Sequence, residues 1–296
     1  MFSRRHPYLF FLLTFTSIVA VATIGMSLLF VLGAKTSDFE FGEKVGVIEV
    51  NGIIADAKNV IQNLKHFRED NSIKAIVIRI DSPGGAVGPS QEIFREIRKT
   101  LSTKKVIASM GAIAASGGYY VAAGTDGIVA NPGTITGSIG VIMGFTNYQE
   151  LLQKIGLVPV VIKSGEFKDI GSPAREMTAK EKTILKDFAK KIHRQFIMDI
   201  VEGRKMDQDK VESLADGRIF TGEESKDLGL VDRLGNLEDA IEWAGRLGGI
   251  KGKISAVYAR EKKLSLLKYL SELSKTEFSN RVFHSFLSAE YIYRPE

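Results

Sequence analysis

Residues 74–110 read KAIVIRIDSPGGAVGPSQEIFREIRKTLSTKKVIASM, in which two apolar runs flank a glycine turn and an amphipathic segment. Both apolar runs are short, rich in β-branched residues and mostly continuous, as strands buried on both faces are. In the segment between them, Pro89 suits a first helical turn. Apolar side chains then recur every fourth residue at Ile93, Ile97 and Leu101, which is the spacing of one helix face. This stretch therefore predicts a strand, a helix and a second strand.

The same alternation continues on both sides of this stretch. Because predicted helices alternate with predicted strands, we expect an α/β fold with a mainly parallel sheet and flanking helices. Thr178 and Glu181 form a capping-box pattern at the start of the longest predicted helix. The predicted strands are 45–50, 74–80, 105–110, 127–131, 138–143 and 158–163. The predicted helices are 56–71, 89–102, 147–156, 178–202, 207–216, 222–228 and 237–248.

The N-terminus carries a long uncharged stretch. No charged residue occurs from Tyr8 to Ala34, which exceeds the roughly 20 residues that a helix needs to cross a bilayer. A cleaved signal peptide is the alternative, but its apolar core is typically about 7–15 residues long, and Leu32 fits poorly at the cleavage site. We therefore favour an uncleaved transmembrane anchor. Arg4 and Arg5 precede it, so the positive-inside rule places the short N-terminus in the cytoplasm and the rest of the chain outside.

The composition restricts the possible partners. The chain has 296 residues, of which 44% are hydrophobic and 25% charged, as in an ordinary folded protein. The net charge of +5 is small and no basic stripe is interleaved with aromatic residues, so no nucleic acid partner is expected. The chain has no cysteine and its four histidines lack ligand spacing, so no metal is expected, although carboxylate-bound metals stay open.

Residues 109–124, SMGAIAASGGYYVAAG, surround Ser116 with small residues. In one interpretation, the small residues let a buried helix pack closely, and the serine bonds to its own helix backbone. In the other, Ser116 is a nucleophile at the start of a helix, and the glycines let backbone approach a substrate. The glycine turn that contains Gly85 follows a strand that ends at the same edge of the sheet. Backbone N–H groups of Gly85 and Gly117 could then form an oxyanion hole, unless the turn is an ordinary connection.

A nucleophilic serine needs a base, and no histidine lies in a suitable turn. Lys168 lies in the Gly/Ser-rich stretch 162–173, directly after a predicted strand. A lysine acts as a base if burial lowers its pKa from about 10.4 to about 7–8. Asp169 would raise that pKa if it pointed the same way. Ser138, in the glycine-rich stretch 131–141, could hold the lysine amine or simply begin a strand.

Together, these segments resemble the signal peptide peptidase A family of membrane-bound serine proteases, over roughly residues 45–235. The resemblance implies the fold shared with Clp protease and crotonase, preceded here by the N-terminal transmembrane helix. The four segments that carry it are DSPGG at 81–85, ASGGYYVA at 115–122, NPGTITGSIGV at 131–141 and KSGEFKDIGSP at 163–173.

The resemblance also implies a role for each candidate residue. Ser116 is expected to be the nucleophile, Lys168 its general base and Ser138 the hydroxyl that orients the lysine. Gly85 and Gly117 are the expected oxyanion donors, without any cofactor or metal. The chain is similar to the single-repeat type of the family, whose subunits are expected to assemble into a ring-forming homo-oligomer.

The implied function is that of a membrane-anchored serine endopeptidase acting on cleaved signal peptides and similar membrane-associated peptides. The alternatives are a related Ser/Lys protease that degrades particular membrane proteins, a non-catalytic membrane scaffold, and a crotonase-like acyl-CoA enzyme. The amphipathic tail could pack on the domain, on another subunit or on the membrane. The expected organisation is a cytoplasmic N-terminus (1–7), a transmembrane anchor (8–34), a linker (35–44), an extracytoplasmic Ser/Lys peptidase domain (45–255) and the tail (256–296).

Overall fold

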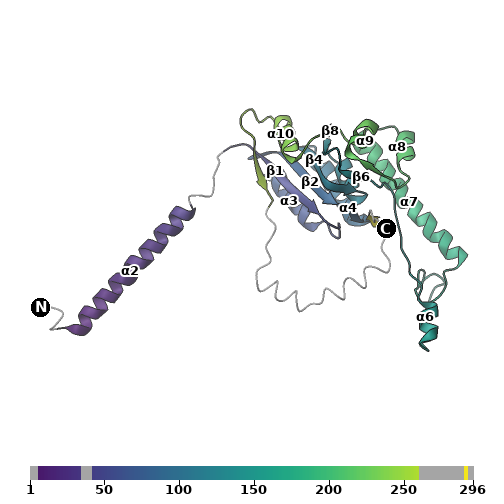
Figure 1. Cartoon of the computed structure of the whole chain (residues 1–296), viewed down its shortest axis with the longest axis horizontal. Helices are drawn as coiled ribbons and strands as arrows, with labels where there is room; N and C mark the ends of the chain where they lie inside the picture. Colours follow the sequence, from purple (N-terminus) through teal and green to yellow (C-terminus); the bar gives the residue numbers. More distant parts are fainter. Residues whose placement is uncertain (1–5, 35–41, 260–289, 293–296) are drawn as a thin grey trace. The chain divides into compact units, whose positions relative to one another are not determined.

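The structure is a computed structural model that describes residues 6–34, 42–259 and 290–292. The chain divides into two compact units, Met1–Gly42 and Glu43–Glu296. The first contains helix α2 (Pro7–Ala34), whose segment Pro7–Leu28 is long and apolar enough to cross a membrane and has no buried residue (Figure 1). A helix that is apolar on all sides and uncovered by protein is typical of a membrane span. The predicted apolar N-terminal helix is therefore present.

The second unit is built on a mainly parallel sheet, as predicted. Its strands run in the order β7-β6-β4-β2-β1-β9, with β5 paired to β4 and β8 to β5. The β6–β7 pair is antiparallel and the other pairs of this sheet are parallel. The strands of this sheet are β1 (Lys44–Asn51), β2 (Ile73–Ser82), β4 (Lys105–Ala115), β5 (Gly127–Ala130), β6 (Ile135–Gly137), β7 (Ile219–Thr221), β8 (Arg233–Leu234) and β9 (Ser255–Tyr258). The strands β3 (Gly84–Ala86) and β10 (Glu290–Ile292) form a separate two-stranded antiparallel sheet.

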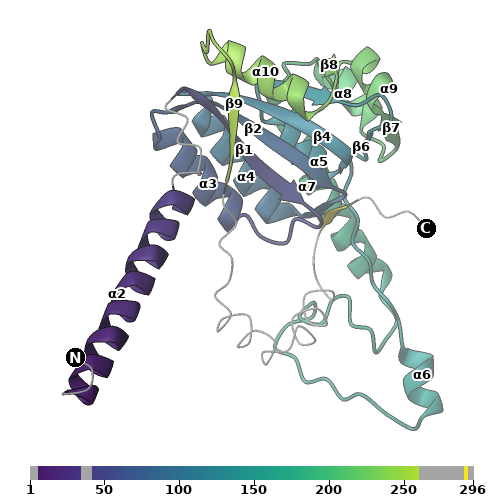
Figure 2. The same ribbon diagram turned by 60° about the vertical axis from the view of Figure 1, so that its left-hand side comes forward.

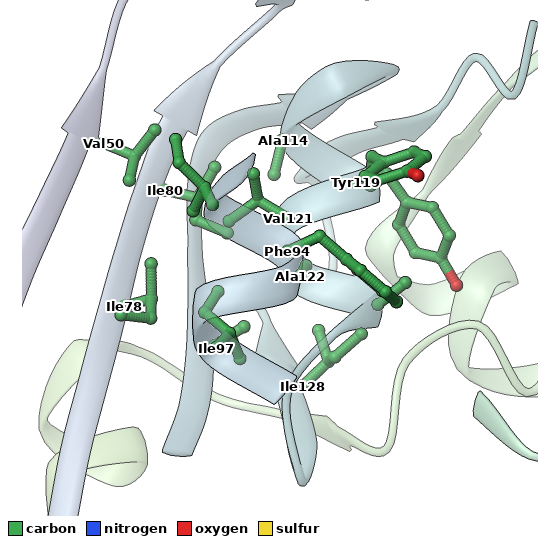
Figure 3. Packing of buried hydrophobic residues seen from close by; sticks show 14 of the residues in the cluster. Val50, Ile78, Ile80, Phe94, Ile97, Ala114, Tyr119, Val121, Ala122 and Ile128 are labelled. Atoms are coloured by element: carbon green, nitrogen blue, oxygen red, sulfur yellow. The ribbon is translucent and has the colours of Figure 1, made fainter. Parts of the chain in front are cut away.

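Helices cover both faces of this sheet (Figure 2). On one face of β2, Ala75 and Val77 belong to an apolar cluster with α10. On the other face, Ile76 and Ile78 belong to the larger cluster with α3, α4, α5 and α7. Figure 3 shows part of this larger cluster. Since both faces are buried, the central strands are apolar without alternation. The helices are α3 (Lys58–Glu69), α4 (Val87–Thr100), α5 (Gly117–Ala123), α6 (Gln149–Lys154), α7 (Ala179–Arg204), α8 (Gln208–Leu214), α9 (Gly222–Leu228) and α10 (Leu237–Leu247).

Local signals set the helix ends. Thr178 accepts a hydrogen bond from the N–H of Glu181, and the Glu181 carboxylate accepts one from the N–H of Thr178, so the predicted capping box of α7 is confirmed. At the other end of α7, Lys205 takes a left-handed conformation with φ +52°. The predicted helices 178–202, 222–228 and 237–248 agree with α7, α9 and α10 to within two residues.

Two predicted strands are wrong. Residues 138–143 do not form a strand, because β6 ends at Gly137 and Ser138 has φ +50°, a left-handed conformation that no strand continues. Residues 158–163 pair with no strand in the described part of the chain, and Ile162 there is 97% exposed. They lie in the segment 142–177, which reaches away from the sheet and carries α6 (Figures 1 and 2).

Candidate active site

Three neighbouring strands, β2, β4 and β6, end at one edge of the sheet. Ala115 of β4 pairs with Gly137 of β6, so Ser116 and Ser138 are the next residues along two adjacent parallel strands. β2 ends beside β4 at Ser82. The carboxyl ends of strands are where α/β sheets bind their ligands. Two of the predicted site residues therefore lie side by side at the expected edge.

Ser116 occupies the N-cap position of α5. It is 1% exposed, and its backbone has φ 53° and ψ −115°, outside the regions that ordinary residues occupy. Its N–H donates to the carbonyl of Gly137 at 2.8 Å, and its carbonyl accepts from the N–H of Tyr120 at 2.8 Å. The hydroxyl neither caps α5 nor makes another hydrogen bond within the described residues. The purely structural interpretation, in which this hydroxyl bonds to the helix backbone, is not what the structure shows.

Ser138 is held in a similar way. It is 8% exposed, and its N–H donates to the carbonyl of Arg218 at 2.8 Å. Thr136, two residues earlier, donates from its hydroxyl to the carbonyl of Ala114 at 2.7 Å, which ties β6 to β4. Between them, Gly137 has φ +76°, and a Cβ atom there would lie 2.6 Å from the ring of Phe220. The chain must therefore carry glycine directly before Ser138.

The turn after β2 carries Gly85 close to the start of α5. Ser82 fixes the turn by accepting a hydrogen bond from the N–H of Gly84 at 3.1 Å. A Cβ atom on Gly85 would lie 2.6 Å from the backbone nitrogen of Ile54, so only glycine fits. Gly117 is the first residue of α5, where an N–H has no acceptor within the helix. Helix α5 contacts β3, so both predicted oxyanion donors belong to this edge.

Lys168, unlike the other predicted site residues, does not lie at the end of a strand or at the start of α5. It is exposed, lies in the segment 142–177, and its ammonium group forms no hydrogen bond or ion pair with any described residue. The neighbouring Asp169 carboxylate is bound by Arg175 at 2.8 Å and Lys163 at 2.6 Å, and these bonds hold the pKa of Asp169 well below its usual range. Asp169 therefore does not engage Lys168. The structure of the single chain does not bring Lys168 into contact with Ser116 or Ser138.

A cavity of about 370 Å³ adjoins Ser138 and is also lined by Lys186, Lys190 and His193 of α7. The Nε2 atom of His193 is buried without a hydrogen-bond partner among the described residues. His193 is not among the predicted site residues, and nothing in its charged helical segment indicates that it lines a cavity with Ser138. In the described part of the chain, no three His, Asp or Glu side chains gather as metal ligands would.

Comparison with known proteins agrees with this fold. The Clp protease family model matches residues 46–135, and the peptidase family S49 model matches residues 98–251. Fold and site thus define a serine peptidase on an α/β fold of the Clp protease kind. The chain belongs to peptidase family S49.

Three relatives show how far the similarity extends. A protein with a protease name in Synechocystis sp. is 47% identical over 210 residues, 70% of this chain and 76% of that protein. A protein named signal peptide peptidase SppA in Enterococcus faecium is 36% identical over 68% of this chain and 62% of its own length. Protease 4 of Salmonella typhi is 32% identical over 71% of this chain and 35% of its own length. The resemblance to the signal peptide peptidase A family is confirmed, and the scaffold and acyl-CoA alternatives lose their support.

Proposed function

We propose that the protein is a membrane-anchored endopeptidase that hydrolyses cleaved signal peptides and similar membrane-associated peptides through a dyad of Ser116 and Lys168. The observation that carries this proposal is the backbone of Ser116. It fixes a hydroxyl that bonds no described residue at the start of α5, beside Ser138 and the Gly85 turn. The substrate class is supported by the name of the Enterococcus relative and by the apolar helix α2.

In the proposed reaction, the Ser116 Oγ gives its proton to the Lys168 amine and attacks the scissile carbonyl carbon. The carbonyl electron pair moves to oxygen, and the N–H groups of Gly85 and Gly117 donate to this oxyanion. Collapse breaks the C–N bond, and Lys168 protonates the leaving amine. Lys168 then takes a proton from water, whose oxygen attacks the acyl carbon. The C–Oγ bond breaks, and Lys168 returns the proton to the Ser116 Oγ. Ser138 orients the lysine amine, and no cofactor enters.

Assembly supplies the missing contact between the two members of the dyad. Lys168 lies on a segment that exposes apolar side chains, with Val158 81% and Val160 83% exposed. A stretch of this kind is normally covered by a partner. In a ring of identical subunits, the segment 142–177 of one subunit can lie over the sheet edge of the next. We therefore place Lys168 of one subunit at Ser116 of its neighbour.

The anchor gives the site its location. We place α2 in the cell membrane with the short N-terminus in the cytoplasm and the peptidase domain, residues 45–255, on the extracytoplasmic side. A tethered domain meets peptides released from the bilayer at a raised local concentration. A related protease that degrades particular membrane proteins would use the same chemistry and differ in substrate only.

The test measures hydrolysis of a fluorogenic peptide with an apolar, small-residue core by the full chain in detergent. We expect Ser116→Ala and Lys168→Ala to lower kcat by about a thousandfold or more, because each removes a reacting group. Ser138→Ala should lower kcat by about a hundredfold or less, because it misplaces the lysine only. Lys154→Ala, which changes another exposed lysine of the same segment, is the control and should keep full activity.

A serine-directed fluorophosphonate provides a second measurement. It should label the wild-type chain and leave Ser116→Ala unlabelled. Full peptidase activity in Ser116→Ala contradicts the proposed nucleophile. Activity retained in Lys168→Ala alone places the base elsewhere, and His193 is then the next residue to change.

A further inference from the structure

Three nitrogen-bearing side chains of α7 lie together beside Ser138. Lys186, Lys190 and His193 recur at the spacing of one helix face, so they project from the same side of α7, and we refer to them as the basic face of α7. All three line the cavity of about 370 Å³ that Ser138 also lines. The basic face therefore borders the proposed active site.

Nitrogen atoms of all three side chains lack partners among the described residues. No hydrogen bond or ion pair joins either lysine side chain to the part of the chain that the structure describes, and the Nε2 atom of His193 is buried without a hydrogen-bond partner there. Asp216 also lines the cavity, but its carboxylate is already bound by the Arg218 guanidinium at 2.8 Å. Like charges four residues apart on a helix repel each other. The cavity therefore favours an anionic group that its own wall does not supply.

An acid of suitable exposure lies next to Lys168. The N–H of Lys168 donates to the carbonyl of Gly165 at 3.1 Å, which closes a turn with Glu166 in its middle. The Glu166 carboxylate pairs with Lys180 at 3.1 Å, and both side chains are 65% exposed. An ion pair as exposed as this contributes little to stability, and a carboxylate has acceptor sites for further donors. Glu166 is therefore available to a second partner.

The proposed dyad brings this turn to the cavity. Ser138, which lines the cavity, is the hydroxyl proposed to orient Lys168 of the neighbouring subunit. Two residues of extended chain span at most about 7 Å, so the Cα atom of Glu166 lies within that distance of the Cα atom of Lys168. Asp169 is as near to Lys168, but its side chain is 13% exposed and bound within its own subunit. Glu166 is therefore the acid that can reach the basic face of α7.

We propose that the Glu166 carboxylate of one subunit binds the basic face of α7 in the neighbouring subunit, and that this contact positions Lys168 at Ser116. The inference rests on the proposed function, because the cross-subunit dyad is what brings the two surfaces together. Glu166 is a positioning residue, since it acts through Lys168 and does not touch the substrate. Opposite charges across an interface fix its register. The partner that fits the cavity is thus the acidic turn of a second copy of this chain.

Charge reversal in the full chain, measured in detergent, tests this contact. Glu166→Lys and Lys190→Glu should each lower kcat about tenfold or more with KM unchanged, because like charges then meet across the interface and displace Lys168. The chain that carries both changes should be about fivefold or more as active as either single variant, because opposite charges meet again. A double variant no more active than its components overturns the inference.

Two further charge reversals are the matched controls. Glu150→Lys changes an exposed acid of the segment 142–177, and Lys191→Glu changes the exposed lysine that follows Lys190 on α7. Neither residue lines the cavity. Both variants should keep full activity, and losses as large as those of Glu166→Lys and Lys190→Glu would show that any change of charge disturbs this region.

Chemical cross-linking tests the contact without measuring activity. The chain contains no cysteine, so Glu166→Cys combined with Lys190→Cys introduces the only two thiols. A bismaleimide joins them, because a disulfide requires Cα atoms within about 7 Å and a contact between two long side chains holds them farther apart. We expect linked dimers and longer products on a denaturing gel, whereas the control pair Glu150→Cys and Lys190→Cys should remain monomeric. Monomers alone, or equal linking in both pairs, overturn the inference.

The two measurements separate failure of this inference from failure of the proposed function. If the selective cross-link forms while no variant cleaves the fluorogenic peptide or reacts with the fluorophosphonate, the proposed function fails and the contact stands. If the wild-type chain cleaves the peptide, charge reversal leaves kcat unchanged and no selective cross-link forms, the contact fails and the proposed function stands.

Discussion

The two serines of the site share a positive φ. Ser116 has φ 53° and Ser138 has φ 50°, in a region that residues other than glycine rarely adopt. Each such residue costs about 1–3 kcal/mol and persists only where its surroundings enforce the conformation. Here the N–H groups of both serines are fixed by hydrogen bonds to the carbonyls of Gly137 and Arg218. The strain therefore falls at the edge where we propose that the reaction takes place.

Gly137 is the residue on which this arrangement depends most directly. Gly137→Ala places a Cβ against the Phe220 ring at φ +76°, so the free energy of unfolding should fall by about 1–3 kcal/mol. Peptidase activity should fall as well, because the strain displaces the Gly137 carbonyl, which accepts the hydrogen bond from the N–H of Ser116. Chemical denaturation and peptide hydrolysis measure the two effects.

Gly133→Ala is the matched control in the same connection. An added Cβ there meets nothing within 4 Å. Stability should therefore stay within about 0.5 kcal/mol of the wild type. A loss as large as that of Gly137→Ala would show that the connection as a whole, and not the left-handed glycine, is sensitive.

At the scale of elements, the sequence predicts well the parts that one chain completes by itself. Strands such as 74–80 and helices such as 178–202 are correct because their apolar faces are covered within the same chain. The run 158–163 has the same composition, yet no other described residue buries it, and no strand forms there. For the same reason the motifs make Lys168 a candidate base but do not predict its distance from Ser116.

Ion pairs give the segment around Lys168 its local shape. Arg175 binds the carboxylates of both Asp169 and Glu181, and Lys163 also binds Asp169. Arg175→Ala should therefore increase hydrogen exchange across residues 163–181 and lower kcat by about tenfold, because the loop that positions Lys168 loosens. Lys182→Ala, which changes an exposed side chain that forms no ion pair with any described residue, is the control and should change neither quantity.

The same cluster predicts a dependence on pH. Hydrogen bonds from Arg175 lower the pKa of Asp169 and, with those of Thr178, lower the pKa of Glu181 to about 2. Folded-state pKa values below the unfolded values, about 4, mean that the pairs stabilise the segment above pH 4. This stabilisation is lost as the pH falls from about 4 toward 2. Hydrogen exchange of residues 163–181, corrected for the intrinsic rate at each pH, should rise in that window, and an unchanged corrected rate would count against the pairs.

At the scale of the whole molecule, we propose that the dyad joins residues of two neighbouring subunits. Mixing Ser116→Ala subunits with Lys168→Ala subunits should restore activity, because an intact Ser116 then meets an intact Lys168 across an interface. Random one-to-one mixing of a ring with head-to-tail interfaces predicts about a quarter of the wild-type activity. Refolding or detergent exchange of the two inactive chains together, followed by peptide hydrolysis, measures it. Mixtures as inactive as their components would require both residues to act within one chain.

Much of the described sheet edge is made of main-chain atoms. Its positions are set by strand register, by the hydrogen bond from Ser116 to Gly137 and by the bridge between Ile54 and the Gly85 turn. A point mutation alters a side chain, and only proline removes a main-chain N–H. Random mutagenesis should therefore find few inactivating changes at this edge, concentrated at its serines and glycines. Homologous chains can then diverge widely around the edge while its geometry persists.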